Sequence, residues 1–76
     1  MAAAQGNMVA RTGFGMLYAT GKGVDKDYAE AAKWLRMAAE QGDPFARYSI
    51  GIMYLEGKGV ARDFEEAARW VGMAAA

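Results

Sequence analysis

Two residue types that carry much of protein chemistry, cysteine and histidine, are missing from this chain of 76 residues. Without cysteine there is neither a disulfide nor a thiolate metal site. Without histidine the chain lacks the commonest general base, the commonest transition-metal ligand and the usual partner of a serine nucleophile. We therefore expect no enzyme activity, no cofactor, and no catalytic or metal-binding residues.

An excess of charge of either sign is also missing, because nine lysine and arginine residues balance nine aspartate and glutamate residues. No basic run stands out, which argues against nucleic acid and against a membrane surface as the main partner. No apolar run approaches the ~18–20 residues of a membrane span. The start, MAAAQGNMVARTG, has neither a basic leader nor a continuous apolar core, so we expect no signal peptide there.

The chain does contain an internal sequence repeat that occurs twice. A shift of 36 residues aligns 2–37 with 38–73 without a gap, and about half of the aligned positions carry the same residue. A period between ~20 and 50 residues is typical of solenoid arrays. We therefore predict a single repeat domain over 1–76, with repeats at 2–37 and 38–73 and the tail of the last helix at 74–76.

Each repeat is predicted to form two helices and no strand. The first helix is expected to begin at Asn7 or at Asp43, which are favoured N-cap residues, and Pro44 suits the first helical position. The second helix is expected to begin at Asp27 or Asp63, each followed three residues later by a glutamate in a pattern like a capping box.

Glycine and alanine carry further information about packing. Gly42 is expected to end a helix, as Gly6 would end a short helix over 2–5. Gly15 and Gly51 lie mid-helix, where glycine costs ~0.5–1 kcal/mol against alanine, and this recurrence suggests a close helix crossing. The apolar residues expected to face the core are Ala10, Phe14, Leu17, Tyr18, Ala46, Ile50, Met53 and Tyr54 in the first helices, and Tyr28, Ala31, Ala32, Trp34, Leu35, Ala38, Ala39, Phe64, Ala67, Ala68, Trp70, Val71, Ala74 and Ala75 in the second.

The tetrapeptide GKGV occurs at 21–24 and again at 57–60. A glycine–lysine–glycine turn can cradle a phosphate, or it can end a helix. A P-loop needs a glycine where this chain has Met16 or Ile52, and a serine or threonine where it has glycine. We interpret GKGV as a repeated structural joint, with its first glycine in the left-handed conformation of a helix C-cap.

The carboxylates Asp25, Asp27 and Glu30 suggest a metal or acid–base site as an alternative to a structural role. Asp27 and Glu30 suit the positive end of a helix dipole. Asp25 is replaced by Ala61 in the second repeat, so the cluster does not recur. We favour the capping interpretation.

Both copies share the pattern A-x-x-x-φ-G-x-x-Y-x-x-G-x-G-V-x-x-D-x-x-x-A-x-x-W-x-x-x-A-A, from Ala10 to Ala39 and from Ala46 to Ala75. The pattern resembles the Sel1-like repeat, a relative of the tetratricopeptide repeat, and covers essentially the whole chain. Phe14 and Ile50 stand where leucine is usual. The resemblance implies an all-α fold, an α-solenoid of antiparallel helix pairs in a right-handed superhelix. It also assigns four aromatic residues to the core: Tyr18, Trp34, Tyr54 and Trp70.

The resemblance implies an adaptor that binds a protein or a peptide, with a place in the bacterial cytoplasm or periplasm. Alignment with tetratricopeptide repeats maps the concave groove onto the first helix of each repeat. The alternative role for Val9 and Phe45 is to staple the start of a helix. The candidate groove residues are Val9, Thr12, Met16, Ala19 and Thr20 in the first repeat and Phe45, Tyr48, Ile52, Leu55 and Glu56 in the second.

These observations predict a non-catalytic protein-interaction module built of two repeats. The alternative is a structural, self-assembling or designed minimal array with no natural ligand. Solenoids usually need three or more repeats and polar outer faces at their ends, whereas both terminal helices here are amphipathic and rich in alanine. A fragment of a longer array and an end-to-end homo-oligomer would both account for such ends.

Overall fold

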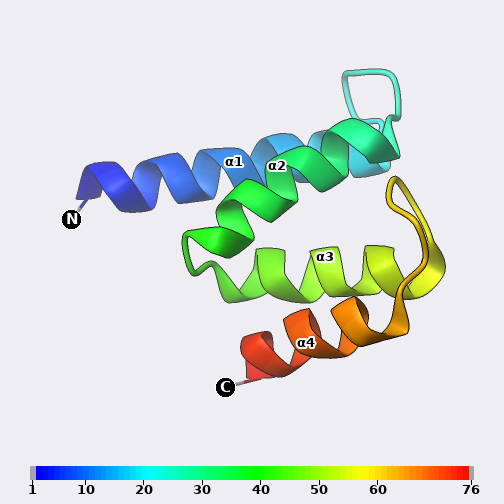
Figure 1. Ribbon diagram of the computed structural model, residues 1–76. Helices are drawn as coiled ribbons and strands as arrows, with labels where there is room; N and C mark the ends of the chain where they lie inside the picture. Colours follow the sequence, from blue (N-terminus) through cyan, green and yellow to red (C-terminus); the bar gives the residue numbers. More distant parts are fainter. Residues whose placement is uncertain (1, 76) are drawn as a thin grey trace.

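Four helices follow one another along the chain in the computed structural model, which describes the backbone of residues 2–75 and the side chains of residues 7–75 (Figure 1). No strand occurs between residues 2 and 75. The predicted all-α class is confirmed. The helices are α1 (Ala2–Thr20), α2 (Tyr28–Glu40), α3 (Pro44–Glu56) and α4 (Phe64–Ala75).

Aspartate side chains cap the starts of α2, α3 and α4, as the sequence predicts. Asp27 Oδ1 accepts hydrogen bonds from two backbone amides of α2, at 3.0 and 3.2 Å. Asp43 Oδ1 does the same for α3 at 2.9 and 3.5 Å. Asp63 Oδ1 does so for α4 at 3.0 and 3.1 Å. Each cap satisfies amides that have no partner inside the helix.

The predicted capping boxes form only in part. The backbone amide of Asp27 donates to the carbonyl oxygen of Tyr18 at 2.9 Å, not to the carboxylate of Glu30. Glu30 pairs instead with Lys33 Nζ at 3.7 Å. The same arrangement recurs at the start of α4. The backbone bond ties the end of each turn to the helix before it.

The start of α1 differs from the prediction. The helix runs without a break through Gly6 and Asn7, so Asn7 is not an N-cap and Gly6 does not end a helix. In the second repeat, Pro44 removes a backbone donor and Asp43 supplies a cap, which together separate α3 from α2. Met8 stands where the second repeat has Pro44, and methionine is a good helix former, so the first repeat lacks the break.

Glycines end α1 and α3 where the GKGV turns begin. Gly57 has φ 70°, and its amide donates to the carbonyl oxygen of Met53 at 2.7 Å. Gly21 has φ 74° and bonds to Leu17 in the same way at 2.8 Å. Glycine adopts this left-handed conformation without the steric cost of a Cβ. The interpretation of GKGV as a helix-ending joint is confirmed.

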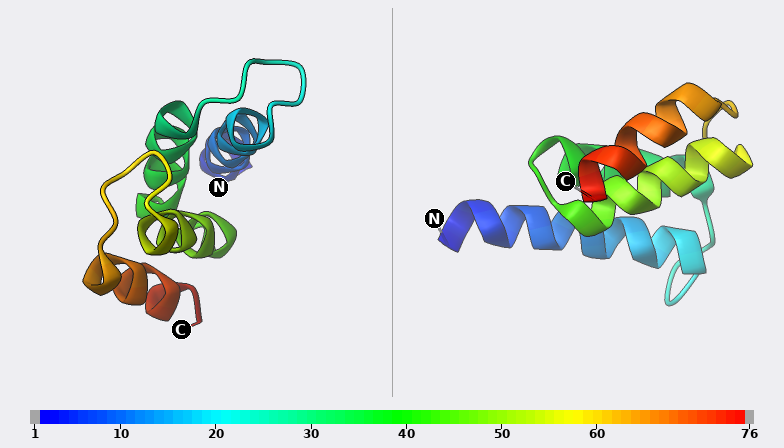
Figure 2. Two further views of the ribbon diagram at one scale, coloured as in Figure 1. Left: turned by 90° about the vertical axis from the view of Figure 1, so that its right-hand side faces the viewer. Right: turned by 90° about the horizontal axis from the view of Figure 1, so that it is seen from below.

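The four helices form two layers. Figure 2 shows α1 and α3 on one side and α2 and α4 on the other, and each helix runs antiparallel to the one before it. The inner helix α2 packs against both α1 and α3, and α3 also packs against α4. The stack is flat, with extents of 33, 32 and 13 Å. It is the α-solenoid of antiparallel helix pairs that the sequence predicts.

Two mid-helix glycines let the paired helices cross closely. A Cβ built on Gly15 would lie 2.6 Å from Leu35 Cγ, and one built on Gly51 would lie 2.7 Å from Val71 Cγ2. Protein interiors do not tolerate such short carbon–carbon distances. The close crossing predicted from the recurring glycine is therefore confirmed in both repeats.

The core lies along α2 and α3, the two inner helices. Leu35 and Ile50 are the largest side chains that are fully buried. Small side chains fill most of the remaining space, which lets the helix backbones approach one another. The other buried hydrophobic residues are Ala31, Ala32, Ala38, Ala39, Ala46, Met53, Tyr54, Ala67 and Trp70.

Several predicted core residues on the outer helices are not buried. Ile50 in α3 is 0% exposed, whereas Phe14, at the same phase in α1, is 47% exposed. Phe64 in α4 is 63% exposed, although Tyr28 at that phase in α2 is half-buried. An outer helix has a neighbour on one side only, so part of its apolar face stays uncovered. The other predicted core residues of the outer helices that are half-buried or exposed are Ala10, Leu17, Tyr18, Ala68, Val71, Ala74 and Ala75. Trp34, on the inner helix α2, was also predicted to be core and is half-buried.

Candidate functional site

A groove of about 310 Å³ lies between α1 and α3, with part of α2 at its floor. Its lining is mostly apolar, and polar groups come only from a few residues at its edges. Two aromatic side chains in it, Phe45 and Tyr48, are 53% and 52% exposed. The lining residues are Met16, Ala19, Tyr28, Leu35, Phe45, Tyr48, Ser49, Ile52, Met53, Glu56 and Lys58.

Helical spacing on α3 forms one wall of this groove. Phe45, Ser49, Ile52 and Glu56 follow one another at steps of three or four residues, so their side chains lie along one stripe of the helix. The opposite wall comes from the last turns of α1, around Met16. Because α1 and α3 lie in the same layer (Figure 2), the groove runs between two helices that are roughly parallel.

The structure brings most of the candidate groove residues together. They come from both repeats, so neither helix pair forms the groove alone. The candidates that line it are Met16, Ala19, Phe45, Tyr48, Ile52 and Glu56.

The other candidates lie elsewhere. Thr12 Oγ1 donates to Asp43 Oδ2 at 2.5 Å and so ties α1 to the cap of α3. Thr20 Oγ1 donates at 2.8 Å to a carbonyl oxygen of its own helix. Val9 is exposed on α1 outside the groove. Leu55 lines a separate hollow formed by α3 and α4.

Five lining residues were not among the candidates. Tyr28 and Leu35 belong to α2, and the alignment with tetratricopeptide repeats considers only the first helix of each repeat. Lys58 belongs to the second GKGV turn, and no periodicity in the sequence marks it. Its position beside α2 follows from the stacking of the repeats. The remaining two are Ser49 and Met53.

Two charged residues close one end of the groove. Lys58 Nζ lies 3.5 Å from Glu56 Oε1 and 5.3 Å from the centre of the Tyr28 ring. Lys26 Nζ lies 5.6 Å from the same ring. A cation over an aromatic face contributes ~0.5–1 kcal/mol at an exposed site. The groove thus combines an apolar length with charge at one end.

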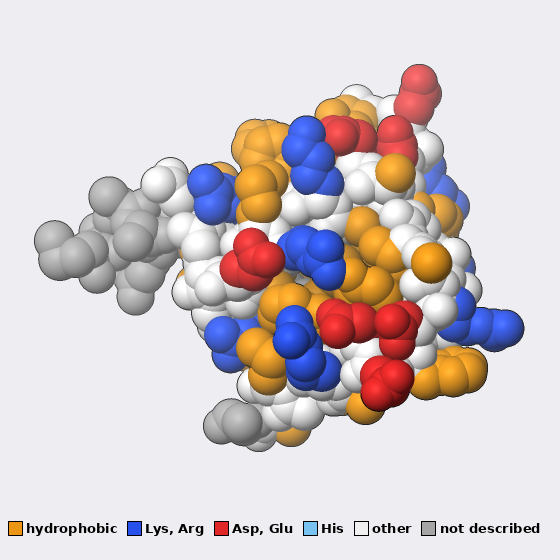
Figure 3. All heavy atoms as spheres, in the orientation of Figure 1, with side chains coloured by type: hydrophobic (Ala, Val, Ile, Leu, Met, Phe, Trp, Pro, Cys, Tyr) orange, Lys and Arg blue, Asp and Glu red, His pale blue; other side chains and the backbone are white. Residues whose placement is uncertain are grey.

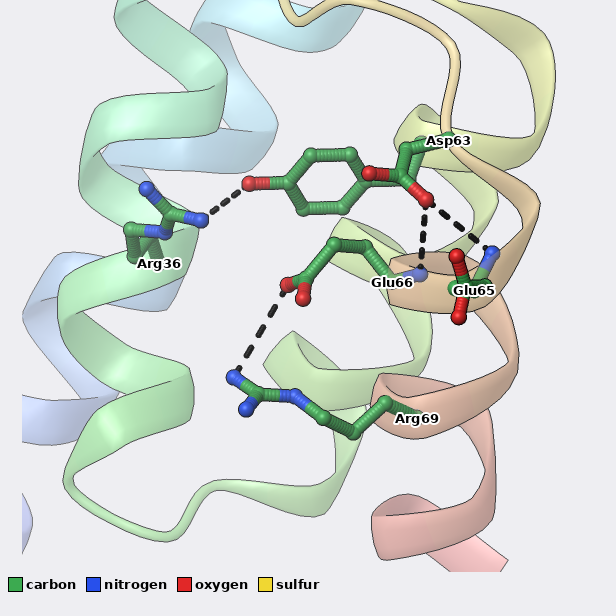
Figure 4. A network of polar contacts seen from close by, with 6 residues as sticks. Arg36, Asp63, Glu65, Glu66 and Arg69 are labelled. Atoms are coloured by element: carbon green, nitrogen blue, oxygen red, sulfur yellow. Dashed lines mark hydrogen bonds and ion pairs between the residues drawn. The ribbon is translucent and has the colours of Figure 1, made fainter.

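The opposite face, formed by α2 and α4, has a different character. Figure 3 shows lysine, arginine, aspartate and glutamate side chains interspersed over it, with hydrophobic side chains between them. Arg36 donates to the hydroxyl of Tyr54. Glu66 pairs with Arg69, with 3.7 Å between Oε1 and Nη2, and the two side chains face each other in Figure 4. Exposed ion pairs contribute only ~0–1 kcal/mol each. Acidic side chains gather at the start of α4, where Asp63, Glu65 and Glu66 lie together with Arg69 beside them.

The described residues offer little to metal or phosphate chemistry. Among them, no three carboxylate, histidine or cysteine side chains lie close enough together to hold a metal ion. The amides of Gly57 and Lys58 both donate to the carbonyl oxygen of Met53, at 2.7 and 3.0 Å, so they are not free to bind a phosphate. None of the described helices has the length and hydropathy needed to cross a membrane.

Comparison with protein families finds the Sel1 repeat twice in this chain, over residues 9–43 and 44–76. The first match begins within α1 and ends after α2, and the second begins at the first residue of α3 and includes α4. No curated protein matches the chain.

Two solved structures are similar over nearly the whole chain. The crystal structure of a Sel1 repeat protein from Oxalobacter formigenes gives a TM-score of 0.89 at 38% identity, and the match covers 93% of this chain and 29% of that one. The crystal structure of c5321, a protective antigen present in uropathogenic Escherichia coli strains that displays an SLR fold, gives 0.90 at 43% identity, covering 97% and 16%. This chain therefore spans less than a third of the length of either protein.

Proposed function

Because this chain belongs to the Sel1 repeat family, we propose that it is a non-catalytic interaction module that binds a peptide or a partner protein in the groove between α1 and α3. Sel1 repeat proteins are generally protein-interaction modules and non-catalytic scaffolds. The observation that carries the proposal is the exposure of the apolar side chains Phe45 and Tyr48 in a groove that both repeats form. Exposed apolar patches are typical of contact surfaces.

The shape of the groove favours an extended peptide. From Phe45 to Glu56 the stripe on α3 spans eleven residue steps, or about 17 Å at the rise of an α-helix. An extended chain advances about 3.3 Å per residue, so about five residues fit along the groove. The partner segment we propose is therefore short and carries apolar side chains that contact Phe45, Tyr48 and Ile52.

The charged residues at one end of the groove favour one direction of the bound peptide over the other. Glu56 and Lys58 pair with each other at 3.5 Å and are both about half exposed, so either can exchange its partner for a charged group of the ligand. Such an exchange adds little affinity, but it favours one direction of binding over the other.

The test begins with selection of binding peptides from a displayed random library, followed by titration of the selected peptides. Tyr48→Ala and Ile52→Ala remove apolar contacts inside the groove, and each is expected to weaken binding by at least about tenfold, the loss for one central apolar anchor. Phe64→Ala is the matched control, because Phe64 is an exposed aromatic residue outside the groove. Binding that survives both groove substitutions at full strength would show that the groove assignment is wrong.

A structural, self-assembling role is the second candidate function. It is favoured by the apolar side chains that α1 and α4 expose at opposite ends of the stack, among them Phe14 and Phe64.

A further inference from the structure

The contact between the two repeats shows how one repeat docks on another. Gly59, in the second GKGV turn, lies against the backbone carbonyl of Tyr28 at the start of α2. Lys58 Nζ lies over the ring of Tyr28, and Val60 lines a small hollow together with Ala32 of α2. The second repeat thus contributes a first helix and a glycine turn, and the first repeat contributes the surface that receives them.

A second receiving surface occurs 36 residues later, and it is open. A hollow of about 230 Å³ lies between α3 and α4. Phe64 in it is 63% exposed, whereas Tyr28, its counterpart in the first repeat, is half-buried. Ala68 is exposed, whereas its counterpart Ala32 is buried. We call this hollow the C-terminal face, and its lining residues are Gly51, Leu55, Phe64, Ala67, Ala68 and Val71.

The docking surface of the second repeat also has a free counterpart, on α1 and the first GKGV turn. Ala46 is 0% exposed in α3, whereas Ala10 at the same phase in α1 is exposed. Since each of these helices has its own second helix beside it, the difference comes from α2, which covers this face of α3, whereas no described helix covers the same face of α1. We call this surface the N-terminal face, and it consists of Ala10, Phe14, Leu17, Lys22, Gly23 and Val24.

The turn residues of the N-terminal face also lack the contacts that their counterparts in the second repeat make. Gly23 has the same left-handed backbone as Gly59, but a Cβ on it would meet no atom within 4 Å. Val24 is exposed, whereas its counterpart Val60 is half-buried. The chain therefore carries both halves of the contact that joins its own repeats, and each half is unoccupied by the described residues.

We propose that the C-terminal face of one copy of this chain receives the N-terminal face of a second copy. In this contact Lys22 of the second copy lies over Phe64 as Lys58 lies over Tyr28, and Gly23 takes the place of Gly59. The occupant is identified by its counterpart within the chain, which fills the equivalent surface of α2. The contact joins two different surfaces, so it propagates from copy to copy along the superhelix and does not close into a symmetric pair.

The contact between copies is weaker than the one within the chain, for two reasons. Arg36, which donates to Tyr54 in the internal contact, corresponds to Gly72, so the equivalent hydrogen bond is missing. The loop that joins α2 to α3 has no counterpart between two separate copies, so association depends on concentration. We expect the native chain to be mostly monomeric at micromolar concentration and to form assemblies of increasing mass towards millimolar concentration.

The test measures molar mass by light scattering across this concentration range for the native chain and for two blocked variants. Phe64→Lys places a cation opposite Lys22 of the incoming copy. Ala10→Arg places a long side chain on the N-terminal face, where it keeps that face from packing closely against the C-terminal face of the other copy. Both positions are exposed in the single chain, and circular dichroism verifies that each variant folds. Each substitution alone is expected to weaken association by at least about tenfold.

A mixture of the two variants makes the test specific. The Ala10→Arg chain keeps its C-terminal face and the Phe64→Lys chain keeps its N-terminal face, so one of each forms a dimer that cannot grow. We expect twice the monomer mass in the mixture and the monomer mass in each variant alone. Phe45→Lys in the groove and Ala61→Arg in the second turn are matched controls that leave assembly unchanged.

Three results would overturn the proposal. A native chain that stays monomeric at millimolar concentration excludes the contact. A mixture of variants that stays monomeric while the native chain assembles shows that the interface is not head-to-tail. Loss of assembly in Phe45→Lys but not in Phe64→Lys shows that the copies meet through the groove.

Discussion

Gly59 lies so close to the backbone carbonyl of Tyr28 that any side chain at position 59 would overlap the carbonyl oxygen. This contact seats the turn of the second repeat on the first helical residue of α2. Gly23 adopts nearly the same backbone conformation, with φ 82° against 76° for Gly59, yet a Cβ there would be in open space. Substitutions at these two positions can therefore be compared to separate the cost of a Cβ in a left-handed backbone from the cost of a steric overlap.

We predict that Gly59→Ala destabilises the chain more than Gly23→Ala does. Both substitutions incur ~1–2 kcal/mol for a Cβ in the left-handed region. Gly59→Ala adds the strain of forcing the turn away from α2, which costs about a further 1–3 kcal/mol. Urea unfolding followed by circular dichroism measures both losses. Equal losses would mean that the turn is not seated on Tyr28.

Gly13→Ala and Gly15→Ala should change stability in opposite directions. Both glycines lie in α1, where alanine is favoured by ~0.5–1 kcal/mol. A Cβ on Gly13 meets nothing within 4 Å, so this substitution stabilises the chain. A Cβ on Gly15 would lie 2.6 Å from Leu35 Cγ, and the resulting strain destabilises the chain by about 1–3 kcal/mol. Thermal unfolding midpoints that rise for both variants would contradict the close crossing of α1 and α2.

Asp63→Ala should cost ~1 kcal/mol, because two amides of α4 lose their acceptor. Asp63→Asn should recover most of that loss, since asparagine also caps helices well. Asp25→Ala is the matched control, because Asp25 is exposed and accepts no hydrogen bond from the described residues. Denaturant titrations of the three variants decide the matter, and a loss for Asp25→Ala as large as for Asp63→Ala would refute the capping role.

Thr12→Val should destabilise the chain without weakening peptide binding. The side chain of Thr12 bonds to the cap of α3 at 2.5 Å, and a lost hydrogen bond costs ~0.5–1.5 kcal/mol. Because Thr12 lies outside the groove, affinity for a selected peptide should match that of the native chain at a temperature where both are folded. A drop in affinity comparable to that of Tyr48→Ala would place Thr12 in the binding surface instead.

Trp70 is 3% exposed and Trp34 is half-buried, which predicts different fluorescence from the two residues. In Trp34→Phe the remaining Trp70 should emit at shorter wavelength and resist quenching by acrylamide. In Trp70→Phe the remaining Trp34 should be quenched more readily. The measurement belongs at micromolar concentration, where the chain is expected to be monomeric, and quenching constants that agree within error would contradict the packing of α4.

Local chemistry made most of the fold predictable. The aspartates at 27, 43 and 63 cap helices as expected, since a carboxylate beside the free amides of a helix start accepts hydrogen bonds from them. The mid-helix glycine was a local signal too. Glycine disfavours a helix interior, so its recurrence at the same phase in both repeats predicted the close helix crossing. The prediction at Asn7 was wrong because a favourable cap does not end a helix by itself, and the first repeat has no proline to enforce the break.

The groove was less predictable, because its lining depends on how the repeats stack. The stripe from Phe45 to Glu56 follows from spacing within one helix. Tyr28 and Lys58 come together only when the second turn lies on α2, and no local pattern specifies that. The prediction that the apolar residues of the outer helices are buried was wrong for the same reason. A repeat pattern marks the face of Phe64 as apolar but does not say whether a neighbour covers it.

Each helix in this stack makes its main contacts with the helices next to it in sequence. The loops that must close during folding are therefore short, and relative contact order is low. Helical proteins of this kind fold in microseconds to milliseconds. Amide hydrogen exchange should be slowest in the two inner helices, α2 and α3, and fastest in the two outer ones, since an outer helix can detach while the rest of the chain stays intact.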